Sequence, residues 1–276
     1  MRYPFQTRII LTLVLPALFF LTLFFLVPLA FLLTESGKSP EGGITLAGYV
    51  AFFQDSISLG IYWRTLKIAL LATAICALIG YPASYAMYRM SDKARSILMS
   101  LVILPLMTNA VARTYAWLII LGRSGLINKL FLWTGLFDEP QRMIYTEGAI
   151  IVGLTQLFLP LMVLSLMSAL ENIPGDVIEA ARSLGANGVI AFGRVVMPLS
   201  MDGFVLGSIL VFTGCVTAYT TPFLLGGTRT LLLSTLLYQR ALVLMDWNSA
   251  TVIAMIMILT TLVVNLLLRQ LRPKHI

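Results

Sequence analysis

Residues 9–33 read IILTLVLPALFFLTLFFLVPLAFLL, a run of the chain that contains no charged side chain. A helix needs roughly 20 apolar residues to cross about 30 Å of hydrocarbon, where lipid offers the backbone no hydrogen-bond partner. The run is longer than the roughly 7–15 residues of a signal-peptide core, and it lacks a small-residue cleavage site. We therefore expect it to remain in the protein as a membrane helix, tilted or kinked near Pro16 and Pro28.

Five further apolar runs follow along the 276 residues. Together the predicted spans are residues 9–33, 65–88, 97–121, 148–170, 204–225 and 249–268. Hydrophobic residues make up 59% of the chain, against roughly 45–50% in a soluble domain. The runs do not alternate apolar and polar residues, which excludes a β-barrel. The sequence thus predicts an all-α, polytopic membrane protein with six transmembrane helices in a single domain over residues 1–276.

Basic residues predict the orientation of the chain. Arg2 and Arg8 precede the first span, residues 89–95 hold three basic side chains after the second, and residues 269–274 hold three more at the end. The loops on the other side carry basic residues that are spread out and mixed with acids. Because short cytoplasmic loops are enriched in Lys and Arg, we expect both termini in the cytoplasm of a bacterial inner membrane.

Several classes of protein are excluded by what the chain lacks. Cys76 and Cys215 lie inside apolar runs, and the one histidine is His275, so no cluster of metal ligands exists. No G-x-x-x-x-G-K-[ST] phosphate loop is present, and no basic patch interleaved with aromatics suggests nucleic acid. The net charge of +7 is then a signal for orientation and lipid headgroups. Energy for transport has to come from a partner chain or from a gradient.

The connection at residues 171–201 is unusually polar and structured for a membrane protein. Apolar and polar residues from Asp176 to Leu184 recur at helical spacing, and Gly185 and Gly188 then predict a sharp turn before a second helix. One interpretation is an interfacial helix that lies on lipid headgroups. The other is a helix that docks a soluble partner on the cytoplasmic side.

The residues of this loop resemble a family signature. Glu179-Ala180-Ala181, three residues, Gly185, and then Met197-Pro198 resemble the signature loop of permease subunits of binding-protein-dependent ATP-binding-cassette (ABC) importers of type I. The resemblance implies that Glu179, Ala180, Ala181, Arg182 and Gly185 dock an ATPase. Residues 80–86, 113–117, 121–128 and 221–227 are similar to the spermidine/putrescine branch of these permeases.

The resemblance also implies the partners of the chain. They are a dimer of cytoplasmic ABC ATPases, a second permease that is a paralogue, a periplasmic substrate-binding protein, and membrane lipid. ATP and Mg²⁺ would be bound by the ATPase, so no cofactor is expected in this chain. The solute would be a small polyamine, or alternatively a related small anionic or zwitterionic solute, such as an amino acid or an aminophosphonate.

Polar residues at membrane depth are the candidates for the translocation pathway, because such groups are unfavourable in lipid unless they are paired or wet. The candidates are Asn109, Arg113, Tyr115, Trp117, Gln156, Thr217, Tyr219 and Thr220. Arg113 in a pathway would attract a carboxylate or phosphonate and repel a polyamine unless a partner neutralised it. Alternatively, Arg113 lies near the outer membrane face and anchors its helix beside Tyr115 and Trp117.

Two other transport mechanisms and an enzyme are weaker alternatives. A gradient-driven carrier usually has two related halves and buried acids, and a channel has a filter loop, none of which the sequence shows. An intramembrane enzyme would need a convergent nucleophile and base. One packing question stays open: the small residues Gly203, Gly207 and Gly214 allow close helix contact either with a second permease or within the chain.

Overall fold

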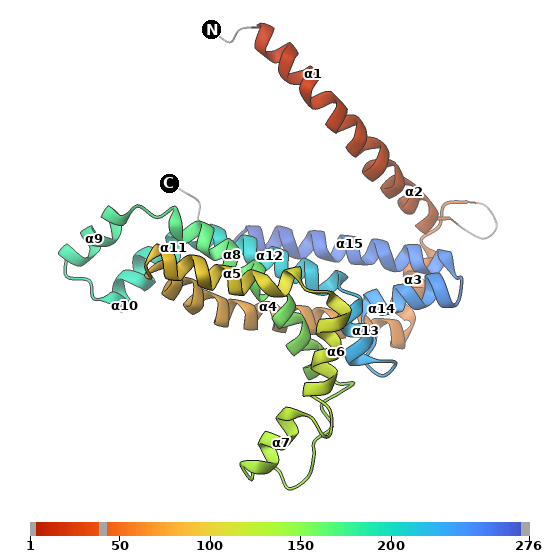
Figure 1. The fold of residues 1–276 in the computed structure, drawn as a ribbon. Coiled ribbons are helices and arrows are strands. Elements are labelled where there is room, and N and C mark those ends of the chain that lie inside the picture. The colour runs from red at the N-terminus through yellow and green to blue at the C-terminus, as the bar shows by residue number, and fades with distance from the viewer. Residues whose placement is uncertain (1–3, 39–42, 272–276) are drawn as a thin grey trace. The chain divides into compact units, whose positions relative to one another are not determined.

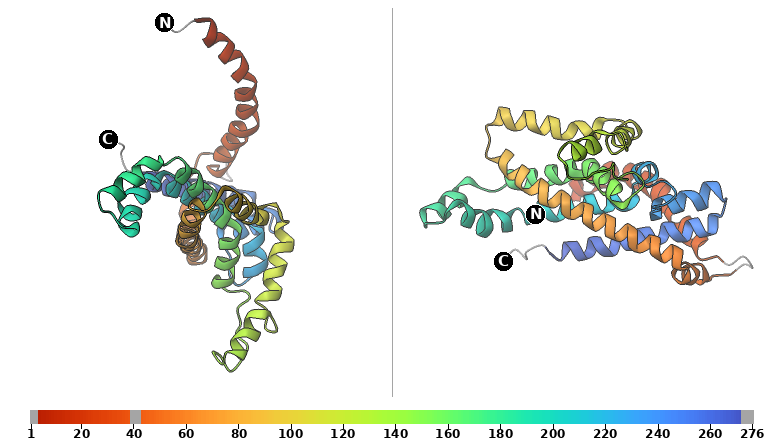
Figure 2. Two further views of the ribbon diagram at one scale, coloured as in Figure 1. Left: turned by 60° about the vertical axis from the view of Figure 1, so that its left-hand side comes forward. Right: turned by 90° about the horizontal axis from the view of Figure 1, so that it is seen from below.

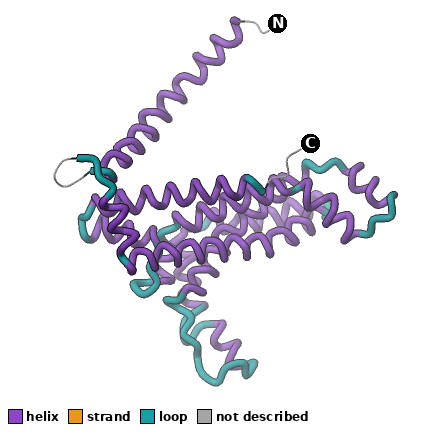
Figure 3. Tube along the Cα trace, turned by 180° about the vertical axis from the view of Figure 1, so that it is seen from behind, coloured by secondary structure: helices purple, strands orange, loops and turns teal. Residues whose placement is uncertain are grey.

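The computed structural model describes residues 4–38 and 43–271, and in this part of the chain the regular elements are helices (Figure 3). Lys38 and Ile44 form one isolated antiparallel bridge. In chain order the elements are α1 (Pro4–Leu21), the π-helical turn η1 (Thr22–Leu26), α2 (Val27–Ser36), α3 (Ala47–Gln54), α4 (Ser56–Tyr88), α5 (Asp92–Met107), α6 (Ala110–Ile120), α7 (Leu126–Trp133), α8 (Glu147–Glu171), α9 (Gly175–Ser183), α10 (Gly188–Ala191), the π-helical turn η2 (Phe192–Val196), α11 (Met197–Leu199), α12 (Met201–Thr217), α13 (Thr220–Gly226), α14 (Leu233–Tyr238), the π-helical turn η3 (Gln239–Val243) and α15 (Trp247–Arg269).

Four of the described helical segments are individually long and apolar enough to cross a membrane. They are Leu13–Ser36, Ser56–Tyr88, Glu147–Glu171 and Trp247–Arg269. Two pairs of helices, α5 with α6 and the segment Gly188–Leu199 with α12, meet the same criterion if each bent pair counts as one span, which raises the number to six. The predicted all-α membrane fold is therefore confirmed. Of the basic residues that predict the orientation, Arg2, Arg272 and Lys274 lie outside the described residues, as does His275.

The chain divides into two compact units, one made of residues 1–59 and 237–258 and the other of residues 60–236 and 259–276. In the first unit, the helix over the first predicted span continues through Pro16, and the π-helical turn η1 comes directly before Pro28. Proline has no N–H to donate, so a wider turn at this point accommodates it. The hydroxyl of Tyr49 in α3 donates a hydrogen bond of 2.8 Å to Ser36 Oγ at the end of α2.

Helix α8 is the centre of the second unit, with Leu154, Leu166 and Leu170 fully buried. Helices α4, α5, α12 and α13 pack around it, as Figures 1 and 2 show. Glycines on α12 allow the closest of these contacts. A Cβ at Gly203 would lie 2.4 Å from Ala169 Cβ, and one at Gly207 would lie 2.7 Å from Met162 Sδ.

The small-residue line on α12 therefore serves packing within the chain. A Cβ at Gly214 would also lie only 2.4 Å from Phe158 Cε1 of α8. The sequence allowed these three glycines to contact either a second permease or another helix of the same chain. All three face α8, and α12 can lie against α8 only because they have no side chain.

The predicted third span contains a break that hydropathy does not reveal. Helix α5 ends at Met107, α6 begins at Ala110, and the two axes differ by 96°. Asn109 causes the restart of the helix, because its side-chain oxygen accepts hydrogen bonds from the amides of Val111 (2.8 Å) and Ala112 (3.2 Å). A side chain that caps in this way competes with a continuous helix.

The predicted fifth span is also interrupted, between Thr217 at the end of α12 and Thr220 at the start of α13. Pro222 explains the interruption, since a proline removes the hydrogen bond to the carbonyl four residues earlier and its ring clashes with that carbonyl. The carbonyl in question belongs to Ala218. It accepts a hydrogen bond of 2.7 Å from the hydroxyl of Ser234 instead.

Candidate functional site

The connection between α8 and α12 forms a helix, a turn and a second helix, as the sequence predicts. Helix α9 ends at Ser183, Gly185 has a φ of +87°, and Asn187 caps α10 by accepting a hydrogen bond of 2.9 Å from the amide of Ile190. Glycine adopts this backbone region without steric penalty, so it can reverse the chain here. Figure 1 shows α9 and α10 beyond the end of α8 that leads into them.

This loop exposes large apolar side chains. Leu184 is 89% exposed and Val189 is 80% exposed, and Val177 and Ile190 are exposed to a lesser degree. Among the predicted docking residues, Glu179 and Ala180 are exposed and Ala181 is half-buried, while the side chain of Arg182 lies outside the described part. Apolar side chains that cluster on a polar, solvent-facing loop are typical of a protein interface.

The two stems of the loop are fixed to the membrane helices by an apolar cluster. Leu170, Ile173 and Val196 are buried together, and Tyr85 and Tyr88 of α4 pack against them. The ring of Phe192 in η2 packs against that of Tyr85 at a tilt of 60°, with 4.7 Å between ring centroids. Close-packed side chains therefore join both stems of the loop to α4 and α8.

Two of the predicted pathway residues lie at the bend between α5 and α6. Asn109 caps α6, as described above. Arg113 is half-buried and donates from Nη1 to the carbonyl oxygen of Pro105 and to Thr108 Oγ1, 3.4 Å away. Arg113 thus bridges the bend, a structural role that neither interpretation from the sequence included, and both of those interpretations stay predictions.

Two other predicted residues, Trp117 and Gln156, lie between α6 and α8, and a third, Tyr219, directly precedes α13. The indole nitrogen of Trp117 donates to Gln156 Oε1 at 3.4 Å, which joins α6 to α8. Between α6 and α13, the hydroxyls of Thr114 and Thr221 are 3.4 Å apart and buried. Tyr219 stacks on Phe223, with ring centroids 5.2 Å apart.

The remaining candidates are less closely grouped. Thr217 is exposed, and its hydroxyl donates to the carbonyl of Thr213 at 2.9 Å. Thr220 is half-buried and begins α13, and Tyr115 is 53% exposed. The structure thus brings Trp117 and Gln156 into direct contact.

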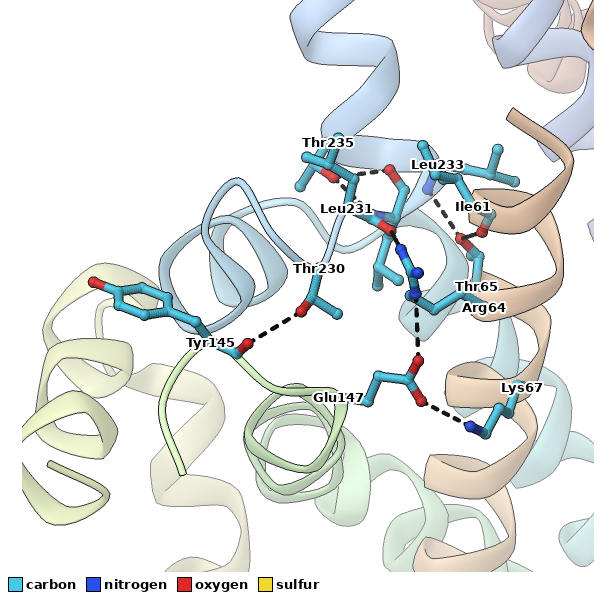
Figure 4. Close-up of polar contacts among 11 residues, drawn as sticks. Ile61, Arg64, Thr65, Lys67, Tyr145, Glu147, Thr230, Leu231, Leu233 and Thr235 are labelled. Atoms are coloured by element: carbon cyan, nitrogen blue, oxygen red, sulfur yellow. Dashed lines mark hydrogen bonds and ion pairs between the residues drawn. The ribbon is translucent and has the colours of Figure 1, made fainter. Parts of the chain in front are cut away.

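A charged cluster on α4 and α8 escaped the sequence analysis (Figure 4). Glu147 at the start of α8 accepts from Lys67 Nζ at 2.8 Å and from Arg64 Nε at 3.3 Å. The sequence signal was present, because Arg64 and Lys67 share one face of a helix. The predicted second span began at Thr65 and obscured the signal, whereas α4 starts at Ser56.

The same part of α4 holds the connection between α13 and α14 (Figure 4). Arg64 Nη1 donates to the carbonyl of Leu231 at 3.4 Å, and Thr65 Oγ1 accepts from the amide of Leu233 at 3.0 Å. From the opposite side, Thr230 donates to the carbonyl of Tyr145 at 3.2 Å. These bonds fix the position of α13, which begins at Thr220 directly after Tyr219.

Comparison with known proteins gives one family. Residues 77–275 match the model of the binding-protein-dependent transport system inner membrane component. The chain is 34% identical over 251 residues to the spermidine/putrescine transport system permease protein PotB of Haemophilus influenzae, covering 88% of this chain and 87% of that protein. It is 33% identical over 218 residues to PotB of Escherichia coli strain K12, covering 79% of each.

The fold is also found among solved structures. A chain of a bacterial alginate ABC transporter, in complex with an alginate pentasaccharide-bound periplasmic protein, superposes with a TM-score of 0.79. The superposition covers 95% of this chain and 93% of that one, at 17% sequence identity. At this identity the likeness concerns the fold.

Proposed function

Because the chain belongs to the family of binding-protein-dependent transport system inner membrane components, the permeases of ABC importers, we propose that it forms the translocation pathway for a polyamine such as spermidine or putrescine. The family makes it a multi-pass protein of the inner membrane. Support for the solute comes from the relatives named as spermidine/putrescine permeases, which match most of the chain at 33–34% identity.

The side chains near the two helix breaks suit an organic cation. Polyamines alternate ammonium groups with short methylene chains, and aromatic faces attract both. Trp117, Tyr219 and Phe223 supply such faces near the breaks. In the described membrane-crossing helices the acidic residues stand only near helix ends. A carboxylate that neutralises the solute within the membrane would therefore come from the second permease, a paralogue of this chain in the proposal.

The loop α9–α10 is the proposed docking site for a cytoplasmic ABC ATPase. The exposed apolar side chains of Leu184 and Val189, on a loop whose stems are anchored in the membrane helices, are the observation that carries this part of the proposal. Glu179 supplies a charge that can pair with a basic group of the ATPase. ATP and Mg²⁺ would be held by that partner, and this chain would need no cofactor of its own.

Coupling then follows from the packing of the loop. When the ATPases close on nucleotide, α9 would move as a rigid lever, and the cluster of Leu170, Ile173 and Val196 would pass the movement to α4 and α8. Since α12 and α13 lie against α8, the helix breaks would move with it. This arrangement requires α9 and both termini on the cytoplasmic side.

Uptake by a reconstituted transporter tests the proposed solute. The chain would be placed in liposomes with its ATPase, second permease and binding protein, and ATP-dependent uptake of labelled spermidine would be measured. We expect putrescine to compete with spermidine and 2-aminoethylphosphonate to leave uptake unchanged. Uptake of the aminophosphonate in place of spermidine would assign the chain to an anionic or zwitterionic solute.

A further inference from the structure

A cavity of about 420 Å³ lies in the second unit, where the connection between α6 and α8 leaves and rejoins these helices. Its walls are Leu121, Arg123, Arg142, Met143, Ile144 and Tyr145. Both arginines are exposed, and the other lining side chains are uncharged. Asp138 and Glu139, the acids of the same connection, are not among the lining residues. The cavity therefore presents two positive charges against a neutral wall.

One buried side chain holds the backbone beside both arginines. Asn128 of α7 is 1% exposed, and its Nδ2 donates to the carbonyl of Gly122 at 2.9 Å and to that of Gln141 at 3.0 Å. Its Oδ1 accepts from the amide of Gln141 at 2.8 Å. Gly122 and Gln141 directly precede Arg123 and Arg142, so Asn128 holds the backbone directly before each arginine.

The turn that carries Arg123 requires glycine. A Cβ at Gly125 would lie 2.4 Å from the carbonyl oxygens of both Ile119 and Ile120. These backbone oxygens cannot move aside to make room for a Cβ, as the end of a flexible side chain could. The chain thus reverses tightly after α6, and Arg123 is held within this reversal.

The wall of the cavity is bonded to α13. Tyr145 has a φ of +62°, which is uncommon for a residue other than glycine. Its amide donates to the carbonyl of Leu225 in α13 at 2.9 Å, and its carbonyl accepts from Thr230. Gly227 faces the Tyr145 ring so closely that a Cβ there would lie 2.8 Å from Tyr145 Cδ1. A group that enters the cavity can therefore act on the position of α13.

We propose that this cavity binds an aspartate or glutamate side chain of the soluble binding protein when that protein docks. The proposal rests on the proposed function, which places α9 at the cytoplasmic end of α8 and hence this connection at the outer end (Figure 1). Two guanidinium groups match one carboxylate, because each can donate two parallel hydrogen bonds. Because Asn128 holds the backbone before both arginines, the frame of the cavity is formed before docking, which favours a rigid protein partner.

Docking would also have a consequence for transport. Because Tyr145 joins the cavity wall to α13, occupation of the cavity by the binding protein would bias the segment that carries Tyr219 and Thr220. Docking of the loaded binding protein at the Arg123–Arg142 cavity would in this way change the conformation of the pathway.

ATPase stimulation by the binding protein tests the proposal. The complex would be reconstituted in phosphatidylcholine nanodiscs, and ATP hydrolysis would be followed against the concentration of spermidine-loaded binding protein. For the double variant Arg123→Gln, Arg142→Gln, we expect the half-maximal concentration to rise about tenfold and basal hydrolysis to stay unchanged. Lys129→Gln is the matched control, an exposed cation of α7 that does not line the cavity.

Three results would overturn the proposal, and they differ in what they mean. An unchanged half-maximal concentration in the double variant would remove the cavity from docking while the proposed function stands. If the variant differed from wild type only in nanodiscs that contain phosphatidylglycerol, the arginines would bind an anionic lipid headgroup. A wild-type complex that no spermidine-loaded binding protein stimulates would contradict the proposed function itself. Added salt should raise the half-maximal concentration more for wild type than for the variant.

Discussion

Arg113, on the first turn of α6, donates a hydrogen bond to the carbonyl oxygen of Pro105, in the last turn of α5. One side chain therefore joins the two halves of the broken third span. The hydroxyl of Thr108 donates to the same carbonyl at 2.8 Å. The bend of 96° is thus held by side chains from both sides of the break.

Replacement of Arg113 tests whether it holds the bend. Arg113→Met should lower the stability of the purified protein by about 1–3 kcal/mol, because a hydrogen bond from a charged group is lost at a half-buried site. The stability of Arg113→Lys should lie between those of Arg113→Met and wild type, since lysine keeps the charge but lacks the planar guanidinium group. Thermal unfolding in detergent measures the effect. A changed KM for spermidine with unaltered stability would instead indicate contact with the solute.

Removal of the charge of Glu147 tests the cluster in Figure 4. In Glu147→Gln, Arg64 and Lys67 would face each other without a carboxylate, and we expect a loss of about 1–3 kcal/mol in the free energy of unfolding. Lys67→Met should have less effect, at most about 1 kcal/mol, because the Lys67 side chain is 61% exposed.

The matched control for this cluster is Glu139→Gln, which removes an exposed acid at the same end of the second unit. Chemical denaturation would be compared for the three variants and wild type. Equal stabilities of Glu147→Gln and Glu139→Gln would show that the cluster adds nothing to the fold.

Glycine substitutions test the contact of α12 with α8. Gly203→Ala should prevent normal packing, since its Cβ would lie 2.5 Å from the carbonyl oxygen of Ser165. Gly60→Ala, on α4, is the control, because nothing lies within 4 Å of its added Cβ. We expect little folded protein for Gly203→Ala and wild-type amounts for Gly60→Ala, measured by size-exclusion chromatography after extraction. Monodisperse Gly203→Ala in normal amount would argue against the α8–α12 contact.

Acid should weaken the first unit through Asp246, which precedes α15. Hydrogen bonds from Ser249, together with the nearby charge of Arg240 at 3.6 Å, hold the pKa of Asp246 below its ordinary value of 3.8. A carboxyl group whose pKa is lower in the folded state than in the unfolded state stabilises the fold. That stability is present at pH values above the pKa of the unfolded state, and it is lost as the pH falls through the pKa of the folded state.

The comparison of wild type with Asp246→Asn isolates this effect. Asparagine keeps an oxygen that can cap α15 and does not titrate. Between pH 5 and pH 3 the unfolding temperature of wild type should therefore fall more steeply than that of the variant. Parallel pH profiles would mean that protonation of Asp246 does not contribute.

Hydropathy predicted the membrane helices, because their apolar length is set by the bilayer and appears in any window of about 20 residues. Averaging over such a window concealed the breaks between α5 and α6 and between α12 and α13, since a single capping residue such as Asn109 hardly changes the mean hydropathy. Pro222 was a visible signal, and the loss of its bond to Ala218 explains the second break. A reading of capping and proline chemistry inside the apolar runs would have indicated both.

The polar loop was predicted well because its information is local: helical spacing up to Leu184 and a glycine at the turn. The contacts of Asn128 could not be predicted in this way. They join backbone groups of Gly122 and Gln141, and the residue types do not indicate which carbonyl an amide side chain will bond. The partners of Glu147 likewise depended on where α4 begins, which hydropathy placed too late in the chain.

Helix α9 docks a cytoplasmic ATPase in the proposed function, and co-purification of that ATPase is the decisive test. The tagged chain would be extracted in mild detergent as wild type, as Glu179→Lys and as the control Glu139→Lys, and its partners identified by mass spectrometry. We predict an ABC ATPase with wild type and with Glu139→Lys, and its loss from Glu179→Lys while the chain remains in the membrane. An ATPase retained equally by all three forms of the chain, or found with none of them, would rule out α9 as the docking site.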